Sequence, residues 1–250
     1  KTFPLTLHHW KNIGILNREI NLLKKISQNS NIKYFLFSFG DESEKQYRDL
    51  IKPIELISYY DTSKKPKKYL FLFLSSLLIP FRIKKILKKI DYLQTNQFWG
   101  VWIVLLINII FKKKYILRFG FEFHHFAKKA KKNKIYLFLI KLLSKISYGR
   151  AYIIIVTSKE IKNYITSNFG INKNKITIIP NYIDTSLFKP IMTKNKFNKI
   201  LCVGRLNRQK NYNLLVESLN SSKIEIDIIG HGDRSNLIEL SRKNNVKVNF

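Results

Sequence analysis

The sequence has one cysteine, few acidic residues and no long apolar run, and each shortage excludes a class of protein. A single thiol, Cys202, excludes a disulfide framework and a cysteine-based zinc site, and it favours a reducing compartment. No basic start followed by an apolar stretch marks an export signal. The longest apolar runs, residues 98–111 and 69–81, are shorter than the ~20 residues of a membrane-spanning helix. These two runs therefore predict buried or interfacial helices.

The abundant residues point to a folded, strongly basic protein. Hydrophobic residues make up 45% of the 250 and aromatic residues 14%, which suffices for a core and excludes wholesale disorder. Lys and Arg number 46 against 16 Asp and Glu, for a formal net charge of +30. Two explanations of this charge stay open. One is the codon bias of an AT-rich genome, and the other is a surface that attracts phosphates, nucleic acid or anionic lipid.

Apolar segments of strand length alternate with segments of helical spacing. A helical stripe runs through Ile15, Ile20 and Leu23, and another through Ile83, Leu87 and Ile90. Apolar strands separated by helices indicate an α/β fold with parallel sheets. The strands expected on this basis span residues 32–38, 91–94, 115–119, 152–157, 176–179, 199–203, 224–229 and 246–250.

The pattern is interrupted near residue 190 by a polar, basic stretch and then restarts. We therefore expect two domains, residues 1–190 and residues 191–250. The second holds three strands and the helices 211–220 and 233–243, fewer elements than a doubly wound domain normally needs. The chain starts at Lys1 instead of a methionine, and we expect further residues on both sides of it.

A strand ends at Gly204 and is followed by the cations Arg205 and Lys210 before the next helix begins. A helix N-terminus carries partial positive charge and unpaired N–H groups, so it favours anions. A diphosphate would satisfy this helix end and both cations. A solvated basic loop is the alternative. Gly230 and Gly232 form a second strand-to-helix corner, which departs from a dinucleotide-binding fingerprint because Ser235 replaces its third glycine.

The histidines favour a ligand crevice over a metal site. Adjacent pairs such as His124 and His125 do not converge on one ion. Glu122 and His124 follow the strand that ends at Phe119, and polar groups at such strand ends line the crevice of parallel sheets. A loop histidine without a role is the alternative.

Two clusters of lysines accompany apolar helical positions. The helix 83–90 carries Lys84, Lys85, Lys88 and Lys89 opposite its apolar stripe, and residues 128–134 lead from a basic cluster into the apolar segment 135–143. Basic amphipathic helices bind anionic membranes, although lysines also form ordinary solvated faces.

The segment 180–190 reads PNYIDTSLFKP, and VGRL at 203–206 and Lys210 follow it. These residues resemble the family 4 retaining glycosyltransferases, whose pattern is P-N-G-V-D-x-x-x-F and then V-G-R-L-x-x-x-K. Tyr182 stands in place of the glycine, and Ile183 in place of the valine. The corner at 229–232 matches the I-G-x-G element that follows in the family, and Gly14 lies in its first glycine loop.

The resemblance implies two Rossmann-like doubly wound domains that face across a cleft, an arrangement called GT-B, with the second domain incomplete here. The C-terminal domain would hold a nucleotide-sugar on Gly204, Arg205, Lys210, Gly230 and Gly232. The N-terminal domain would hold the acceptor near Gly14 and Arg118. Glu122 and His124 are the catalytic candidates on that side. The family's acidic motif is expected after Phe250.

The sequence thus predicts a metal- and cofactor-independent hexosyltransferase that acts with retention. It would lie on the cytoplasmic face of an anionic membrane and transfer sugar to a lipid-linked or polysaccharide acceptor of the cell envelope. The alternative is a non-catalytic nucleic-acid-binding protein. Against it, the aromatic residues lie mostly inside apolar runs and are not interleaved with cations.

Overall fold

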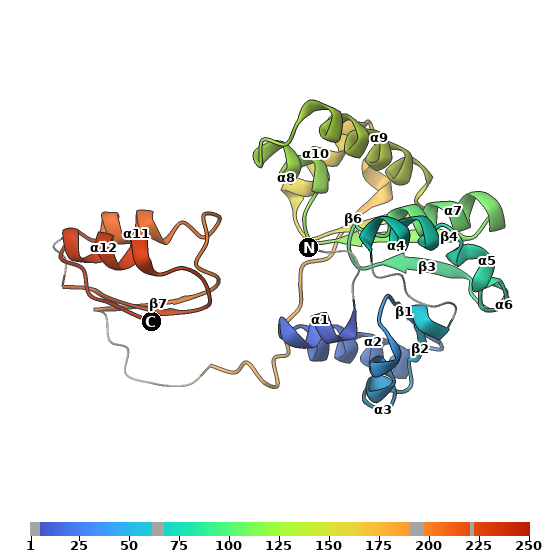
Figure 1. Ribbon diagram of the computed structural model, residues 1–250, viewed down its shortest axis with the longest axis horizontal. Helices are drawn as coiled ribbons and strands as arrows, with labels where there is room; N and C mark the ends of the chain where they lie inside the picture. The colour runs from blue at the N-terminus through green and yellow to red at the C-terminus, as the bar shows by residue number, and fades with distance from the viewer. Residues whose placement is uncertain (1–5, 62–67, 191–197, 221–222) are drawn as a thin grey trace. The chain divides into compact units, whose positions relative to one another are not determined.

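The computed structural model describes residues 6–61, 68–190, 198–220 and 223–250. The chain forms two compact units, Lys1–Phe188 (unit 1) and Lys189–Phe250 (unit 2). Both units are built from parallel strands and helices (Figure 1).

The described residues of unit 1 form six strands in two parallel sheets. One sheet pairs β1 with β2, and the other has the order β3-β4-β5-β6. The strands are β1 (Phe35–Ser38), β2 (Glu55–Ser58), β3 (Tyr92–Thr95), β4 (Lys114–Phe119), β5 (Ile153–Val156) and β6 (Ile176–Ile178). The helices are α1 (Leu7–Asn12), α2 (Leu16–Asn29), α3 (Arg48–Ile51), α4 (Tyr69–Ser76), α5 (Ile79–Arg82), α6 (Lys84–Leu87), α7 (Val101–Phe111), α8 (Phe123–Lys129), α9 (Lys134–Arg150) and α10 (Lys159–Phe169), with 3-10 turns η1 (Glu42–Tyr47), η2 (Tyr59–Asp61) and η3 (Lys173–Lys175).

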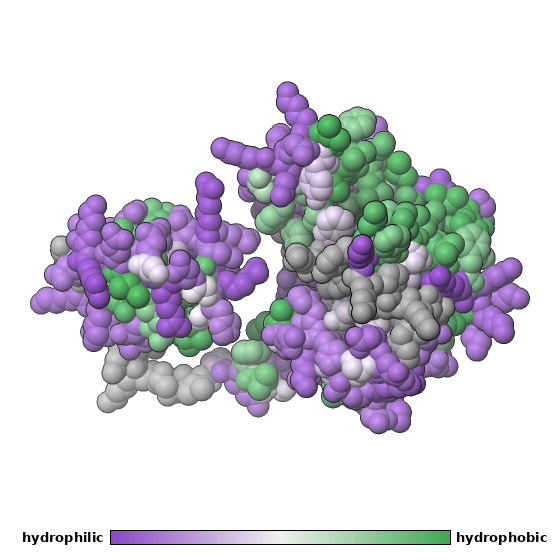
Figure 2. All heavy atoms as spheres, viewed as in Figure 1, coloured by the Kyte–Doolittle hydropathy of each residue, from purple (hydrophilic) through white to green (hydrophobic). Residues whose placement is uncertain are grey.

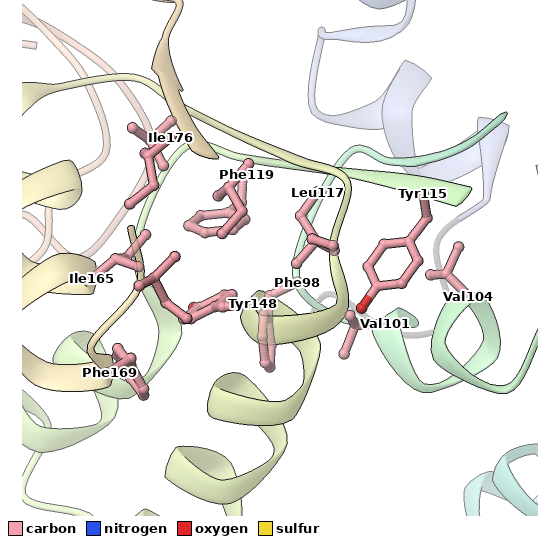
Figure 3. Close-up of a cluster of buried hydrophobic side chains, with 14 residues drawn as sticks. Phe98, Val101, Val104, Tyr115, Leu117, Phe119, Tyr148, Ile165, Phe169 and Ile176 are labelled. Carbon is pink, nitrogen blue, oxygen red and sulfur yellow. The ribbon is translucent and has the colours of Figure 1, made fainter. Parts of the chain in front are cut away.

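Alternate side chains of the central strand β4 form the core of the four-stranded sheet. Tyr115, Leu117 and Phe119 alternate along β4 and are buried on one face of the strand. Figure 3 shows them beside side chains of α7 and α9, and Tyr148 of α9 stacks on Phe119 with ring centroids 5.7 Å apart. The phenol of Tyr115 donates to the Ser147 carbonyl oxygen at 2.7 Å, so burying this tyrosine leaves no orphaned hydroxyl.

A cavity of about 750 Å³ separates the two sheets of unit 1. It is lined by β1 and β3 and by apolar residues of α5 and α7, among them Ile79 and Ile103. In the described chain, β1 pairs only with β2 and β3 only with β4. Two buried polar atoms of lining residues, Trp10 Nε1 and Gln97 Oε1, have no hydrogen-bond partner within the described residues.

Unit 2 is a three-stranded parallel sheet of order β7-β8-β9 with two helices. Its elements are β7 (Lys199–Val203), α11 (Tyr212–Ser218), β8 (Glu225–Ile229), α12 (Ser235–Lys243) and β9 (Val248–Asn249). Val216 and Leu237 of the helices bury Ile226 and Ile228 of the central strand. On the other face of the sheet, Leu201, Val203 and Ile229 are exposed.

All eight strands expected from the alternating pattern are present. One has the expected bounds, and the ends of the others differ by one to three residues. The structure also contains β2 (Glu55–Ser58), which was not predicted. The segment 101–111 forms a buried helix, as one of the two alternatives predicted. The helix expected at 211–220 is shorter, because Asn211 takes a left-handed φ of 50° and the helix ends at Ser218.

Candidate functional site

The carboxyl ends of β3, β4 and β5 meet at one edge of the four-stranded sheet, because all of its strands are parallel. Residues from separate loops contact each other there. The Arg118 backbone N–H donates to Thr95 Oγ1 at 3.3 Å, and Thr157 Oγ1 donates to the Gly120 carbonyl oxygen at 3.1 Å. Such edges carry the ligand crevice in open parallel sheets, so this edge is the candidate acceptor side.

Glu122 lies at this edge, but its carboxylate points into the protein and is buried. Oε2 caps α8 by accepting from the His125 backbone N–H at 2.5 Å, and Oε1 accepts from the Tyr148 hydroxyl at 2.8 Å. Burial, with the negative charge of Glu122 as a second cause, raises the pKa of Tyr148 well above its usual value. Both carboxylate oxygens therefore make contacts that fix the position of α8 relative to α9.

His124 is also buried, within the first turn of α8. Its Nδ1 lies 3.0 Å from the Tyr164 hydroxyl of α10, and its ring packs edge-on against Phe169. Burial lowers the pKa of His124, while Glu122 acts in the opposite direction. The imidazole is therefore neutral at pH 7.

Arg118 pairs with a residue that the sequence did not single out. Its Nη1 lies 3.2 Å from Glu19 Oε2 of α2, and Arg18 Nη2 lies 2.7 Å from Glu19 Oε1. Glu19 is buried, although it belongs to an amphipathic helix in which a glutamate normally faces solvent. No spacing in the sequence reveals this contact across 99 residues.

Tyr182 lies near Glu19 and Arg118, a contact that its position in the sequence did not indicate. Burial raises the pKa of its hydroxyl, and the nearby Glu19 carboxylate raises it further, while Arg118 acts in the opposite direction. The side chain that replaces the family's glycine therefore lies beside the ion pair of Glu19 and Arg118.

Gly14 lies in the loop between α1 and α2. It has a left-handed φ of 73°, and a Cβ placed there would meet no atom within 4 Å. Its backbone N–H donates to the Lys11 carbonyl oxygen and closes the end of α1. The loop is thus open toward solvent at the position where the family places its first glycine.

In unit 2, Gly204 lets Lys210 fold back over the end of β7. A Cβ on Gly204 would lie 3.2 Å from Lys210 Cε and 2.9 Å from the Tyr212 hydroxyl. Arg205 and Lys210 are exposed, and no ion pair is found for either within the described residues. The structure thus presents two cations beside one glycine corner. The helix α11 that follows has seven residues, so its contribution to anion binding is small.

Backbone packing alone explains why glycine is required at positions 230 and 232, without reference to a ligand. A Cβ on Gly230 would lie 1.8 Å from the Gly204 carbonyl oxygen, and one on Gly232 would lie 2.4 Å from that of Leu206. Leu206 and Gly232 form a parallel bridge, in which the Leu206 N–H donates to the His231 carbonyl oxygen at 2.8 Å. These glycines therefore let the loops after β7 and β8 approach each other, which keeps Arg205 beside the second corner.

In the described part of the chain, no group of three or more His, Cys, Asp and Glu side chains is placed to hold a metal ion. His8, one of the paired histidines, contacts Ser43 Oγ and the Tyr47 hydroxyl. No helix within residues 6–61, 68–190, 198–220 and 223–250 has the length and apolar character that crossing a membrane requires.

Comparison with known proteins identifies the family. Residues 22–187 match Glycosyltransferase Family 4. A search of curated proteins gives no match. Solved structures share the fold, among them a glycosyltransferase from Rickettsia africae (18% identity, TM-score 0.62) and the lipopolysaccharide outer core galactosyltransferase WaaB (16%, 0.61). The Anabaena protein Alr3699/HepE, solved with UDP-glucose, is 14% identical with a TM-score of 0.58.

In these three comparisons, in the order given, the aligned region takes in 95%, 92% and 86% of this chain. It takes in only 65%, 61% and 60% of the solved chains. The α/β fold with Rossmann-like parallel sheets is thereby confirmed as GT-B. On the match over residues 22–187 and the shared fold, the protein belongs to Glycosyltransferase Family 4.

Proposed function

We propose that the protein to which this chain belongs transfers a hexose from a nucleotide-sugar to a lipid-linked or polysaccharide acceptor in cell-envelope glycan synthesis, with retention at the anomeric carbon. The observation that carries the proposal is the pair of exposed cations, Arg205 and Lys210, at the glycine corner of unit 2. A nucleotide-sugar is the substrate of this chemistry, and the solved relative with UDP-glucose has the same fold.

The two cations would act on the leaving nucleotide. When the bond between the sugar and the diphosphate breaks, negative charge accumulates on the diphosphate oxygens. A guanidinium binds two phosphate oxygens at once, and an ammonium adds a compact charge beside them. Because the loop that carries both cations is bridged through Leu206 to the loop after β8, its backbone is positioned before the reaction, which is the condition for electrostatic catalysis. We propose that this step needs no metal and no cofactor.

On the acceptor side, we propose that His124 and Glu122 have different roles. Glu122 is a positioning residue, because both of its oxygens hold α8 and α9 in place. His124 is neutral at pH 7 and has Nδ1 at Tyr164, so Nε2 is the atom we assign to the acceptor hydroxyl. Arg118 and the loop at Gly14 would border the acceptor, and Arg118 would act through its pair with Glu19.

We propose that the reaction takes place on the cytoplasmic face of an anionic membrane, where nucleotide-sugars and lipid-linked acceptors meet. The exposed lysines of residues 84–89 and 128–134 support this location, because clustered cations are attracted to anionic lipid. The family assignment favours this proposal over nucleic-acid binding as the reason for the basic surface.

The test is sugar transfer by the complete protein from a panel of labelled UDP- and GDP-sugars to membrane lipid extract. Arg205→Ala and Lys210→Ala should each lower turnover by at least about 100-fold, because each removes a preorganised cation. Arg242→Ala and Lys243→Ala are the matched controls, since these exposed cations lie at the end of α12 away from the glycine corners. Turnover that is unchanged in both test variants would remove the donor-site assignment.

A further inference from the structure

The outward face of α9 is apolar, and its inward face contains polar residues. The exposed side chains are Ile135, Phe138, Leu139, Leu142 and Ile146, with exposed fractions between 42% and 74%. They follow the spacing of one helical face. The buried side holds Ile140 and Tyr148 together with Ser144 and Ser147, so apolar residues face both the core and the outside. A helix on the surface of a globular protein normally carries polar residues on its outward face.

This apolar face continues onto neighbouring helices. Leu70, Phe71 and Leu74 of α4 and Phe81 of α5 are exposed as well. Phe73 of α4 contacts Trp102 of α7, Phe81 contacts Phe111 of α7, and α7 packs against α9, so the exposed residues lie on connected elements. Figure 2 shows hydrophobic residues gathered over this region of unit 1. We call these four residues, together with the five of α9, the apolar surface.

A row of lysines borders the apolar surface. Lys134, Lys141 and Lys145 are exposed and spaced by seven and four residues, which places them along one edge of the outward stripe of α9. Lysine side chains at such an edge lay their methylene groups on apolar material and keep the ammonium in the polar layer. Lys131 and Lys132, also exposed, precede the helix.

We propose that the apolar surface inserts into the headgroup–acyl boundary of an anionic bilayer, with the lysine row of α9 at the anionic headgroups. The combination of an apolar stripe and a flanking cationic row is what an interfacial helix requires. A second copy of the chain is the weaker occupant, because pairing two such faces brings two lysine rows together in molecules with a formal net charge of +30 each.

The proposal deepens the membrane location included in the proposed function by assigning it to a surface other than α6. Ile83 and Leu87, in that helix and its flank, are buried in the protein core, so this apolar stripe does not reach the surface and cannot insert into lipid. Lys84 and Lys85 therefore supply charge without insertion. Membrane contact through α6 alone would be purely electrostatic and lost in salt, whereas insertion through α9 persists in part.

The experiment is sedimentation of the 250-residue chain with vesicles of phosphatidylcholine alone and with phosphatidylglycerol added, at low and high salt. The test variant carries Ile135→Gln, Phe138→Gln and Leu142→Gln, all at exposed positions that leave the core intact. Its matched control carries Ile13→Gln, Ile32→Gln and Leu50→Gln, three exposed apolar residues of unit 1 outside the apolar surface. A charge variant carries Lys134→Gln, Lys141→Gln and Lys145→Gln, with Lys11→Gln, Lys25→Gln and Lys159→Gln as its control.

We expect the apolar test variant to bind anionic vesicles at least about 10-fold more weakly than its control at both salt concentrations, because it lacks three apolar side chains that would insert into the bilayer. The lysine variant should bind more weakly than its control at low salt only. Equal binding by the apolar variant and its control would overturn the proposal. So would a concentration-dependent dimer in light scattering that this variant abolishes, since a second copy would then cover the surface. No sugar donor enters this assay, so its result is separable from failure of the transferase function.

Discussion

Arg118 of β4 and Glu19 of α2 form an ion pair with 3.2 Å between Nη1 and Oε2, and their side chains are 18% and 9% exposed. The pair ties the first long helix of unit 1 to the carboxyl end of the central sheet. Because water has little access, this contact is screened less than an ion pair on the surface. Tyr182, from the segment that precedes unit 2, lies beside it.

Removing either partner should destabilise unit 1 by about 1–3 kcal/mol, since the remaining charge loses its counter-ion in a dry site. In a double-mutant cycle, Arg118→Ala and Glu19→Ala should be coupled by about 1 kcal/mol or more. Urea unfolding followed by tryptophan fluorescence reports on unit 1, because all three tryptophans lie there. The exposed pair Lys52–Asp49 should show no measurable coupling, and strictly additive effects for Arg118 and Glu19 would contradict this account.

Glu122 should prove to be structural. Glu122→Ala removes the cap of α8 and leaves the Tyr148 hydroxyl without its acceptor, which should cost about 2–4 kcal/mol. Glu122→Gln keeps one acceptor oxygen and should cost less in the same unfolding assay. In the complete protein, Glu122→Gln should retain most turnover. A glutamine variant of normal stability that has lost its turnover would instead show that the carboxylate takes part in the reaction.

Gly230→Ala should destabilise unit 2 by about 2 kcal/mol or more, because its Cβ would collide with the Gly204 carbonyl oxygen. Hydrogen exchange of the β7 and β8 amides measures this effect within unit 2. Gly149→Ala is the control, since this glycine of α9 has open space around its Cβ position and alanine favours a helix. If exchange in β7 and β8 is unchanged by Gly230→Ala, the loops do not need the close approach described above.

His124 should lower stability in acid. Burial holds its folded-state pKa below the unfolded value of about 6.5, so the unfolded chain binds the proton more tightly. The contribution of the neutral His124 to the free energy of unfolding is therefore lost as the pH falls below about 6.5. The urea midpoint of unit 1 should drop less between pH 7.5 and pH 5.5 in His124→Gln than in the unchanged chain or in His231→Gln. Identical drops in all three would disprove a buried, neutral His124.

Local patterns predicted the repeating elements because strands such as β5 (IIIV) and β7 (KILCV) are short and mainly apolar runs with polar flanks. The strand β2 was missed because Glu55 and Ser58 interrupt its apolar character and a proline precedes it. The sequence indicated the apolar segment 135–143 beside a basic cluster as a candidate membrane contact, but it did not indicate which side of α9 is exposed. Helical spacing identifies an apolar stripe but not the side that it faces, and here the stripe faces away from the core.

The site could be predicted where a motif is contiguous in sequence and not where it depends on packing. Gly204, Arg205 and Lys210 lie within seven residues, so their clustering was visible in the sequence. The buried orientation of Glu122 depends on Tyr148 of another helix, and the pairing of Arg118 depends on Glu19, 99 residues away. Such contacts are set by the tertiary fold.

The most direct test of the central claim, that Arg205 and Lys210 hold the donor diphosphate, is calorimetric titration of the 250-residue chain with pyrophosphate, UDP and GDP at low salt. We predict weak binding of all three with little preference for a base, because two cations aimed at a diphosphate supply no hydrogen-bonding partners for the base. Arg205→Ala and Lys210→Ala should each abolish the heat, while Arg242→Ala leaves it unchanged. Unaltered binding in both test variants, or tight binding of one nucleotide without pyrophosphate binding, would contradict the claim.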